Sequence, residues 1–227
     1  MVDRQAGVAS MRVGLVSDTH LPALFRQLDG IGPEAARFFE TVDLILHAGD
    51  VTAPSVLDWL EQFAPVVVAR GNNDDFQDRR MAPRQMLDLQ GWRVGMVHDL
   101  TPESRPLPLL RERFFGDGAE VMISGHTHLE RLECRDGLLL INAGSPILPH
   151  HKETRLGCVG LLELRPGSLR AEIVPLGETA GRPNPTRALA LEMEKAPVRD
   201  RWPGCAENEL SSTYSPKTAA LPAAGEE

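Results

Sequence analysis

VGLVSDTH at residues 13–20 and LILHAGD at residues 44–50 decide the fold, because each joins a compact apolar run to a carboxylate. Runs of this kind are typical of buried strands that end at a site. PVVVARGNND, residues 65–74, repeats the pattern, and helices are predicted between the strands over 33–40 and 54–63. The order strand–helix–strand–helix–strand predicts parallel pairing through helical crossovers. The polar strand ends should therefore meet at one edge of the sheet, where open α/β sheets usually carry their sites.

Tight turns replace the helical crossovers from about residue 85 onward. Gln90-Gly91, Asp136-Gly137 and Pro166-Gly167 lie between apolar runs and predict three hairpins. A further strand is predicted within AEVMISGHTH, residues 119–128. The two halves together predict a layered α/β sandwich.

Composition divides the chain into three parts. Residues 1–10 form a short leader, residues 11–177 carry the strand and helix pattern, and residues 178–227 are rich in Pro, Ala and Glu. The last part is predicted to be largely flexible, apart from one short helix over 188–195.

Charge and cysteine content restrict the partners and the compartment. The net charge of −8 and the pI of about 5.4 argue against a nucleic-acid-binding surface and favour a small phosphate compound as the partner. Cys134, Cys158 and Cys205 are too few and too scattered for a disulfide framework or a zinc site. No apolar run approaches the roughly 18 residues of a membrane span, and no secretory signal is recognisable. We therefore expect a cytoplasmic protein without a membrane partner, and the sequence leaves a homo-oligomer open.

Five short motifs place oxygen and nitrogen donors directly after apolar runs. Alternate residues of a strand point the same way, so each pair separated by one residue should face one side. Seven donors are too many for one ion, whereas two divalent ions sharing one carboxylate would use them all. Ligands without thiolate suit Mn²⁺, Fe²⁺, Ni²⁺, Co²⁺ or Zn²⁺. The predicted metal ligands are Asp18, His20, Asp50, Asn72, His98, His126 and His128.

Other polar residues near these motifs have simpler interpretations. His47 is predicted to be a packed histidine or one that supports the site. His150 and His151 are predicted to be solvated loop residues, with lining of the site as the alternative. Arg70 is either a phosphate-binding group or a solvated arginine. Phe25 and Arg26 are expected to form one wall of the cleft.

The motif order D-x-H, GD, GNxD, H and GHTH resembles the calcineurin-like metallophosphoesterase superfamily. The short spacing, GNND and INAGSP (141–146) are most similar to its small bacterial and archaeal phosphodiesterase branch, near which a eukaryotic retromer subunit also belongs. The resemblance covers residues 11–176. It implies a four-layer α/β/β/α sandwich with mixed sheets.

The resemblance also implies a role for each residue of the motifs. One ion would be held by Asp18, His20, Asp50 and His128, and the expected metal is Mn²⁺. The second would be held by Asp50, Asn72, His98 and His126, so that Asp50 bridges the two ions. A hydroxide bridging the ions would attack the phosphate ester in line, without a covalent intermediate. Asp74 would steady the Asn72 loop and complete the catalytic set of Asp50, Asn72, His98 and Asp74, while Gly144 and Ser145 would shape the rim.

Two departures from the family pattern bear on the substrate. Asn73 stands where the phosphoprotein phosphatases have a histidine that protonates the leaving group, and such proton donation typically gives about 10²–10⁴-fold in rate. Asp99-Leu100 replaces the Gly-His that often follows the ligand histidine. The added carboxylate is expected to tighten cation binding, repel an anionic substrate or face solvent, and the sequence does not choose.

Three functions follow from these residues. A metal-dependent phosphodiesterase is the first, because all seven ligands are present and the phosphatase-type histidine is absent. A binding scaffold that has lost its chemistry is the alternative, consistent with the retromer resemblance. A nuclease would share the chemistry, but the acidic balance disfavours it.

Overall fold

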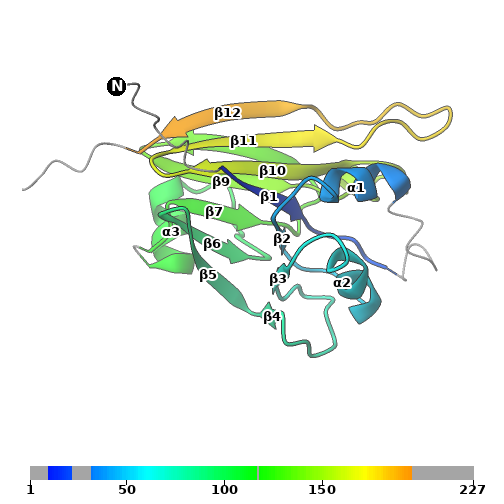
Figure 1. Cartoon of the computed structure of the whole chain (residues 1–227), viewed down its shortest axis with the longest axis horizontal. Helices are drawn as coiled ribbons and strands as arrows, with labels where there is room; N and C mark the ends of the chain where they lie inside the picture. The colour runs from blue at the N-terminus through cyan, green and yellow to red at the C-terminus, as the bar shows by residue number, and fades with distance from the viewer. Residues whose placement is uncertain (1–9, 22–31, 117, 196–227) are drawn as a thin grey trace, which may run out of the picture. The chain divides into compact units, whose positions relative to one another are not determined.

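The computed structural model describes residues 10–21, 32–116 and 118–195, and these residues form two mixed β-sheets (Figure 1). The first sheet has the order β12-β11-β10-β1-β2-β3-β4. Its parallel half comprises β1 (Met11–Val16), β2 (Leu44–His47), β3 (Val66–Ala69) and β4 (Met81–Ala82). Its antiparallel half comprises β10 (Cys158–Arg165), β11 (Ser168–Pro175) and β12 (Leu189–Glu194).

The second sheet has the order β5-β6-β7-β9-β8. Its strands are β5 (Arg84–Leu89), β6 (Trp92–Val97), β7 (Val121–Ser124), β8 (Glu130–Arg135) and β9 (Leu138–Ala143). The central strands β6, β7 and β9 are parallel, and the two edge strands are antiparallel to their neighbours. All six residues of β9 are buried, as expected for a strand covered on both faces.

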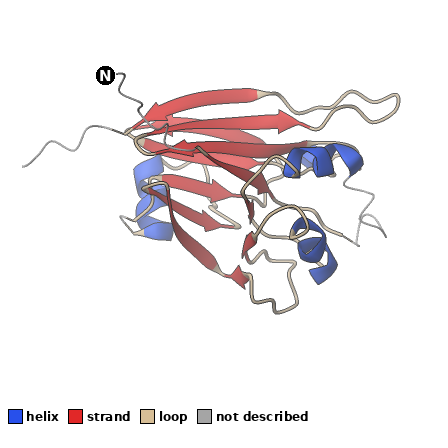
Figure 2. Cartoon of the chain, in the orientation of Figure 1, coloured by secondary structure: helices blue, strands red, loops and turns tan. Residues whose placement is uncertain are grey.

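Three hydrophobic clusters define four layers. One lies between the sheets and joins residues such as Leu15 and Leu46 to Met96, Ile123 and Ile141. A second packs α1 (Gly32–Phe39) and α2 (Pro54–Leu60) on the outer face of the first sheet. A third packs α3 (Leu107–Phe115) on the outer face of the second sheet. The helices thus flank the strands, as Figure 2 shows, and the predicted α/β/β/α sandwich is confirmed.

The three predicted hairpins are present as β5–β6, β8–β9 and β10–β11. The helix predicted over 188–195 is wrong, because those residues form β12 and pair with β11. Leu191 and Met193 lie opposite Ala171 and Leu169, with Met193 buried against the core. Burial of alternate side chains against an existing sheet edge outweighs the helix propensity of this segment. Helix α3 was not predicted from the sequence.

No helix among the described residues is long and apolar enough to cross a membrane. The remainder of the predicted tail, residues 196–227, lies outside the described residues, as do residues 1–9.

Candidate metal centre

The predicted ligands come together where the parallel strands of both sheets end. They lie in the turns that follow β1, β2 and β3 in the first sheet and β6 and β7 in the second. Parallel strands leave their carboxyl ends at a common edge, which brings residues far apart in sequence into one site. The residues brought together in this way are Asp18, His20, Asp50, Asn72, His98, His126 and His128.

The backbone of this site differs from the expected extended strand. Asp18, His20, Asp50, His126 and His128 have positive φ angles of 55°, 47°, 56°, 69° and 53°. These left-handed conformations are uncommon for residues other than glycine and cluster at functional sites. The prediction that strand alternation aligns the ligand pairs is therefore wrong. Turned backbone beyond the strand ends aligns them instead.

Glycines in three of the motifs allow the turns to approach one another, as the sequence predicted. A Cβ atom on Gly71 would collide with the backbone nitrogen of Asp50. A Cβ atom on Gly125 would lie 2.8 Å from Oδ2 of Asp18 and 2.8 Å from Cβ of Ser17. The absence of a side chain at these positions is what permits the close contact.

One half of the site is built around the buried carboxylate of Asp18. Its oxygens accept the backbone N–H of His126 at 3.2 and 3.0 Å. The Nε2 atoms of His20 and His128 lie 3.9 and 3.5 Å from Oδ1 of Asp18 and 3.1 Å from each other. The other ring nitrogen of His128 donates to the carbonyl of Leu148 at 2.8 Å, which directs Nε2 into the site.

The other half is built around the carboxamide of Asn72. Its Oδ1 lies 3.0 Å from Nε2 of His98 and 3.1 Å from Nδ1 of His126. Nδ1 of His98 donates to the carbonyl of Ala48 at 2.7 Å, so its Nε2 also faces the site. His98, like His128, therefore has the backbone-oriented geometry that metal-binding histidines usually show.

Asp50 lies between the two halves. Its Oδ2 is 3.6 Å from Nε2 of His20 and 3.4 Å from Nε2 of His98. Asn73 donates its backbone N–H to Oδ1 at 2.9 Å and its side-chain N–H to Oδ2 at 2.6 Å. Two sets of ligand atoms lie within 4.8 Å of one another, one from Asp18, His20 and His128 and one from Asp18, Asp50 and His98.

The buried carboxylate of Asp74 binds the backbone of two turns that carry predicted ligands. Its oxygens accept the backbone N–H groups of Asp50 at 3.1 Å, Thr52 at 2.8 Å and Gly71 at 2.8 Å. It therefore ties the turn after β2 to the turn after β3, and these turns carry Asp50 and Asn72.

Burial and mutual interactions shift the pKa values of the ionisable groups in the site. Burial raises the pKa of Asp18 to about 7. Burial opposes ionisation of Asp50, but hydrogen bonds from His98 and Asn73 outweigh it and hold the pKa of Asp50 well below its usual range. Burial also opposes protonation of His98, yet Asp50 and Asp18 raise its pKa to about 9. Burial lowers the pKa of His128 to about 4, which leaves its Nε2 lone pair free for a metal.

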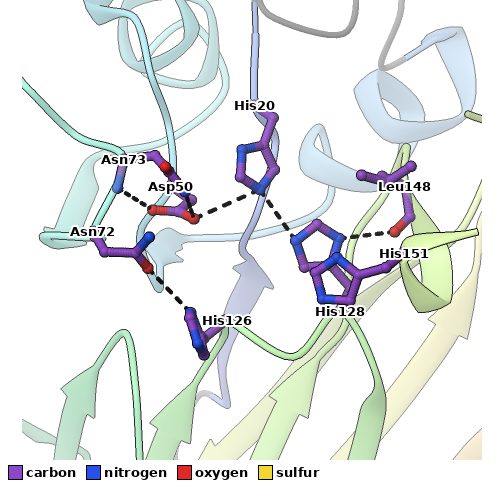
Figure 3. Close-up of a pocket in the computed structure, with 8 residues that line it drawn as sticks. All are labelled: His20, Asp50, Asn72, Asn73, His126, His128, Leu148 and His151. Atoms are coloured by element: carbon purple, nitrogen blue, oxygen red, sulfur yellow. Dashed lines mark hydrogen bonds and ion pairs between the residues drawn. The ribbon is translucent and has the colours of Figure 1, made fainter.

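A pocket of about 220 Å³ opens onto five of the predicted ligands, among them Asp50 and His128, and Figure 3 shows the residues that line it. The ring of His151 stacks on the ring of His128, with 3.6 Å between centroids, and lines the pocket. His150 instead pairs with Glu130 at 2.7 Å. His151 is exposed, as predicted, and also lines the pocket, which was the alternative prediction. The prediction of a solvated residue is wrong for His150, which is half-buried and paired. The full lining is His20, Asp50, Asn72, Asn73, His126, His128, Leu148 and His151.

The remaining predicted residues occupy different positions. His47 is buried and bonded to Thr19 and to the backbone of Gly49, as a supporting histidine would be. Ser145 lies beneath the site rather than at its rim, because its buried hydroxyl donates to the carbonyl of Asp18 at 2.8 Å.

The turn after β6 contains Asp99 and Leu100, which depart from the family pattern. Leu100 is fully buried against α3, whereas Asp99 is exposed and accepts the N–H of Thr101 at 2.7 Å. Phe25 and Arg26 lie outside the described residues.

Comparison with known proteins identifies the family. The model of the calcineurin-like phosphoesterase superfamily domain matches residues 11–167. A probable metallophosphoesterase of Methanothermobacter thermautotrophicus is 34% identical over 168 residues, which span 74% of this chain and 94% of the relative. Phosphodiesterase YfcE of Escherichia coli K12 is 28% identical over 155 residues, spanning 61% of this chain and 81% of the relative.

The fold is also that of solved structures. Vacuolar Protein Sorting 29 of Cryptosporidium parvum superposes with a TM-score of 0.67 at 17% identity, over 82% of this chain and 99% of that chain. The resemblance drawn from the motifs is thereby confirmed. The chain belongs to the calcineurin-like phosphoesterase superfamily, in its branch of small prokaryotic metallophosphoesterases, and its chemistry is metal-dependent hydrolysis of phosphate esters.

Proposed function

We propose that the protein is a phosphodiesterase that works with two divalent metal ions. One ion would be held by Asp18, His20, Asp50 and His128, and the other by Asp50, Asn72, His98 and His126. Asp74 would act as a positioning residue for both sets. The substrate would be a small phosphodiester that enters the pocket above the ligands.

The position of Asp50 carries this proposal. Its Oδ2 is 3.6 Å from His20 and 3.4 Å from His98, so one carboxylate faces donors of both sets. The fixed ring orientations of His98 and His128 add to this, since each has its Nδ1 bonded to a backbone carbonyl. Such an arrangement suits two ions that share a carboxylate.

The chain's own residues divide the work of hydrolysis. Divalent ions bound here would lower the pKa of water and withdraw charge from the phosphoryl group. Asp50 and the carboxamide of Asn72 set the spacing of the ligand groups. His151 and Leu148 bound the pocket on the side of His128 and limit how the substrate can lie.

The preference for a diester rests on Asn73. Its side-chain N–H donates to Oδ2 of Asp50 at 2.6 Å. A carboxamide cannot transfer a proton to a leaving group as a protonated histidine does. A leaving group that needs protonation should therefore react slowly. The similarity to a relative named phosphodiesterase supports the same preference.

The oxygen and nitrogen donors suit Mn²⁺, Fe²⁺, Ni²⁺, Co²⁺ or Zn²⁺, and we propose Mn²⁺ as the ion used, with the others as substitutes. The location in the cytoplasm and a homo-oligomeric state stay predictions from the sequence.

Hydrolysis of bis(p-nitrophenyl) phosphate and p-nitrophenyl phosphate by metal-stripped protein tests the proposal, with each ion added back. We expect metal-restored turnover that favours the diester and a loss to below about 1% of wild type in His98→Ala and Asp50→Ala. Asp75→Asn, a change at an exposed acid beside Asp74, is the matched control and should retain activity. Folded protein without turnover under any ion would instead support the scaffold alternative.

A further inference from the structure

A second hollow of about 450 Å³ lies beside the metal pocket. Asn72 and His126 line both, so the two spaces share a wall made of ligands proposed for the second ion. A substrate bound at that ion would therefore lie next to the second hollow. Its volume falls within the range typical of small-molecule sites.

One side of the second hollow is apolar. Val97 comes from the end of β6, Pro83 from the link between β4 and β5, and Phe114 from the last turn of α3. Phe114 is half-buried, and the guanidinium of Arg113 lies 5.2 Å from the centre of its ring. Such a wall suits a flat ring better than a small alkyl group, because aromatic contacts add to the area buried.

The other side carries hydrogen-bonding groups with unused capacity. Arg70 donates to the carbonyl of Asp74 at 3.1 Å and to Gln77 at 3.0 Å, and a guanidinium has five N–H donors. Asp99 uses Oδ1 to accept the N–H of Thr101. The hollow therefore offers both a donor and an acceptor next to an apolar wall.

We propose that the second hollow binds one ester group of the phosphodiester, and that this group is an aromatic ring with a hydrogen-bonding edge, as in a nucleoside. The inference rests on the proposed function and specifies its substrate class. Phe114, Pro83 and Val97 contact the ring, and Asp99 and Arg70 bind its polar edge. Asp99, which departs from the family pattern, thereby acquires a role in selecting the substrate.

Titration calorimetry of the Mn²⁺-loaded protein with slowly reacting diesters tests this assignment. The probes are dimethyl phosphate, methyl phenyl phosphate and the methyl ester of adenosine 5′-monophosphate. We expect the phenyl ester to bind about tenfold more tightly than dimethyl phosphate, and the adenosine ester more tightly again. Phe114→Ala should remove most of the advantage of both aromatic esters, and Asp99→Ala should remove about tenfold from the adenosine ester alone.

Leu109→Ala provides the matched control, because Leu109 is 49% exposed on the same helix and does not line the hollow. It should leave the ratios between the three affinities unchanged. Equal affinities in the wild type, or ratios that Phe114→Ala does not alter, would overturn the inference.

The same set of measurements separates this inference from the proposed function. Turnover of bis(p-nitrophenyl) phosphate without any affinity difference between the probes would refute the assignment of the second hollow alone. An affinity difference that depends on Phe114, in a protein without turnover, would refute the proposed function and support binding in the second hollow.

Discussion

Asp74 offers the most direct test of how the metal ligands are positioned. Its carboxylate is 6% exposed and accepts three backbone N–H groups from the turns that carry Asp50 and Asn72. At about 1 kcal/mol for each bond, and up to about twice that for a charged acceptor, Asp74→Ala should lower the free energy of unfolding by about 3–6 kcal/mol. Metal affinity should fall about 10–100-fold, the usual cost of losing a group that orients ligands.

Urea unfolding in the presence of a chelator measures the first effect. With a slope near 2 kcal/mol per molar urea, a loss of about 3 kcal/mol moves the midpoint by about 1.5 M. Asp74→Asn keeps one oxygen acceptor, but its side-chain NH₂ group would face one of the three backbone N–H groups. It should therefore lower the free energy of unfolding by less than Asp74→Ala. Asp75→Ala removes an exposed neighbouring acid as the control. If the midpoints and metal affinities of Asp74→Ala and Asp75→Ala coincide, the three bonds do not hold the site together.

Three further changes test the chemistry and the fold. The first ion must displace the proton of Asp18, with a pKa of about 7, and the second that of His98, with a pKa of about 9, so the affinity for the second ion should fall about tenfold per pH unit below 9 and that for the first about tenfold per pH unit below 7. Calorimetry across this range measures the slope, and a pH-independent affinity would contradict the assignment. Gly125→Ala places a Cβ atom 2.8 Å from Asp18 and should weaken metal binding at least about tenfold, whereas Gly95→Ala, away from the site, should lower stability without changing that affinity. Met193→Asp should cost about 2–3 kcal/mol in urea unfolding because Met193 is 7% exposed in β12, and an unchanged midpoint would favour the helix over the strand.

The candidate ligands could be proposed from the sequence because the chemistry of such residues is local in sequence. Apolar runs that end in Asp, His or Asn identify both the strands and the ligands, and glycines beside Asp50 and Asn72 indicate close backbone approach. The family resemblance then assigned the order of the layers, which the two sheets and three hydrophobic clusters confirm.

Segments without such signals were predicted less well. ALALEMEK consists of residues that favour helices, and only the free edge of β11 makes residues 189–194 a strand. The segment of α3 contains Pro108 and lacks a clear apolar stripe, and its burial is visible only when Leu107 and Leu110 meet the second sheet. Neither outcome is encoded within the segment itself.

The sequence by itself thus determined which side chains are candidate metal ligands and in what order they follow the strands, since the type of side chain and its place after a strand are local properties. Only the tertiary structure decided how they converge. Left-handed turns, rather than strand alternation, aim Asp18, His20, His126 and His128 inward, because backbone conformation beyond a strand depends on what packs around it. The place of His151 was also decided by the tertiary structure. Its turn is distant in sequence from His128, on whose ring it stacks in the pocket. Contacts of this kind depend on the packing of both sheets, which no single stretch of the chain specifies.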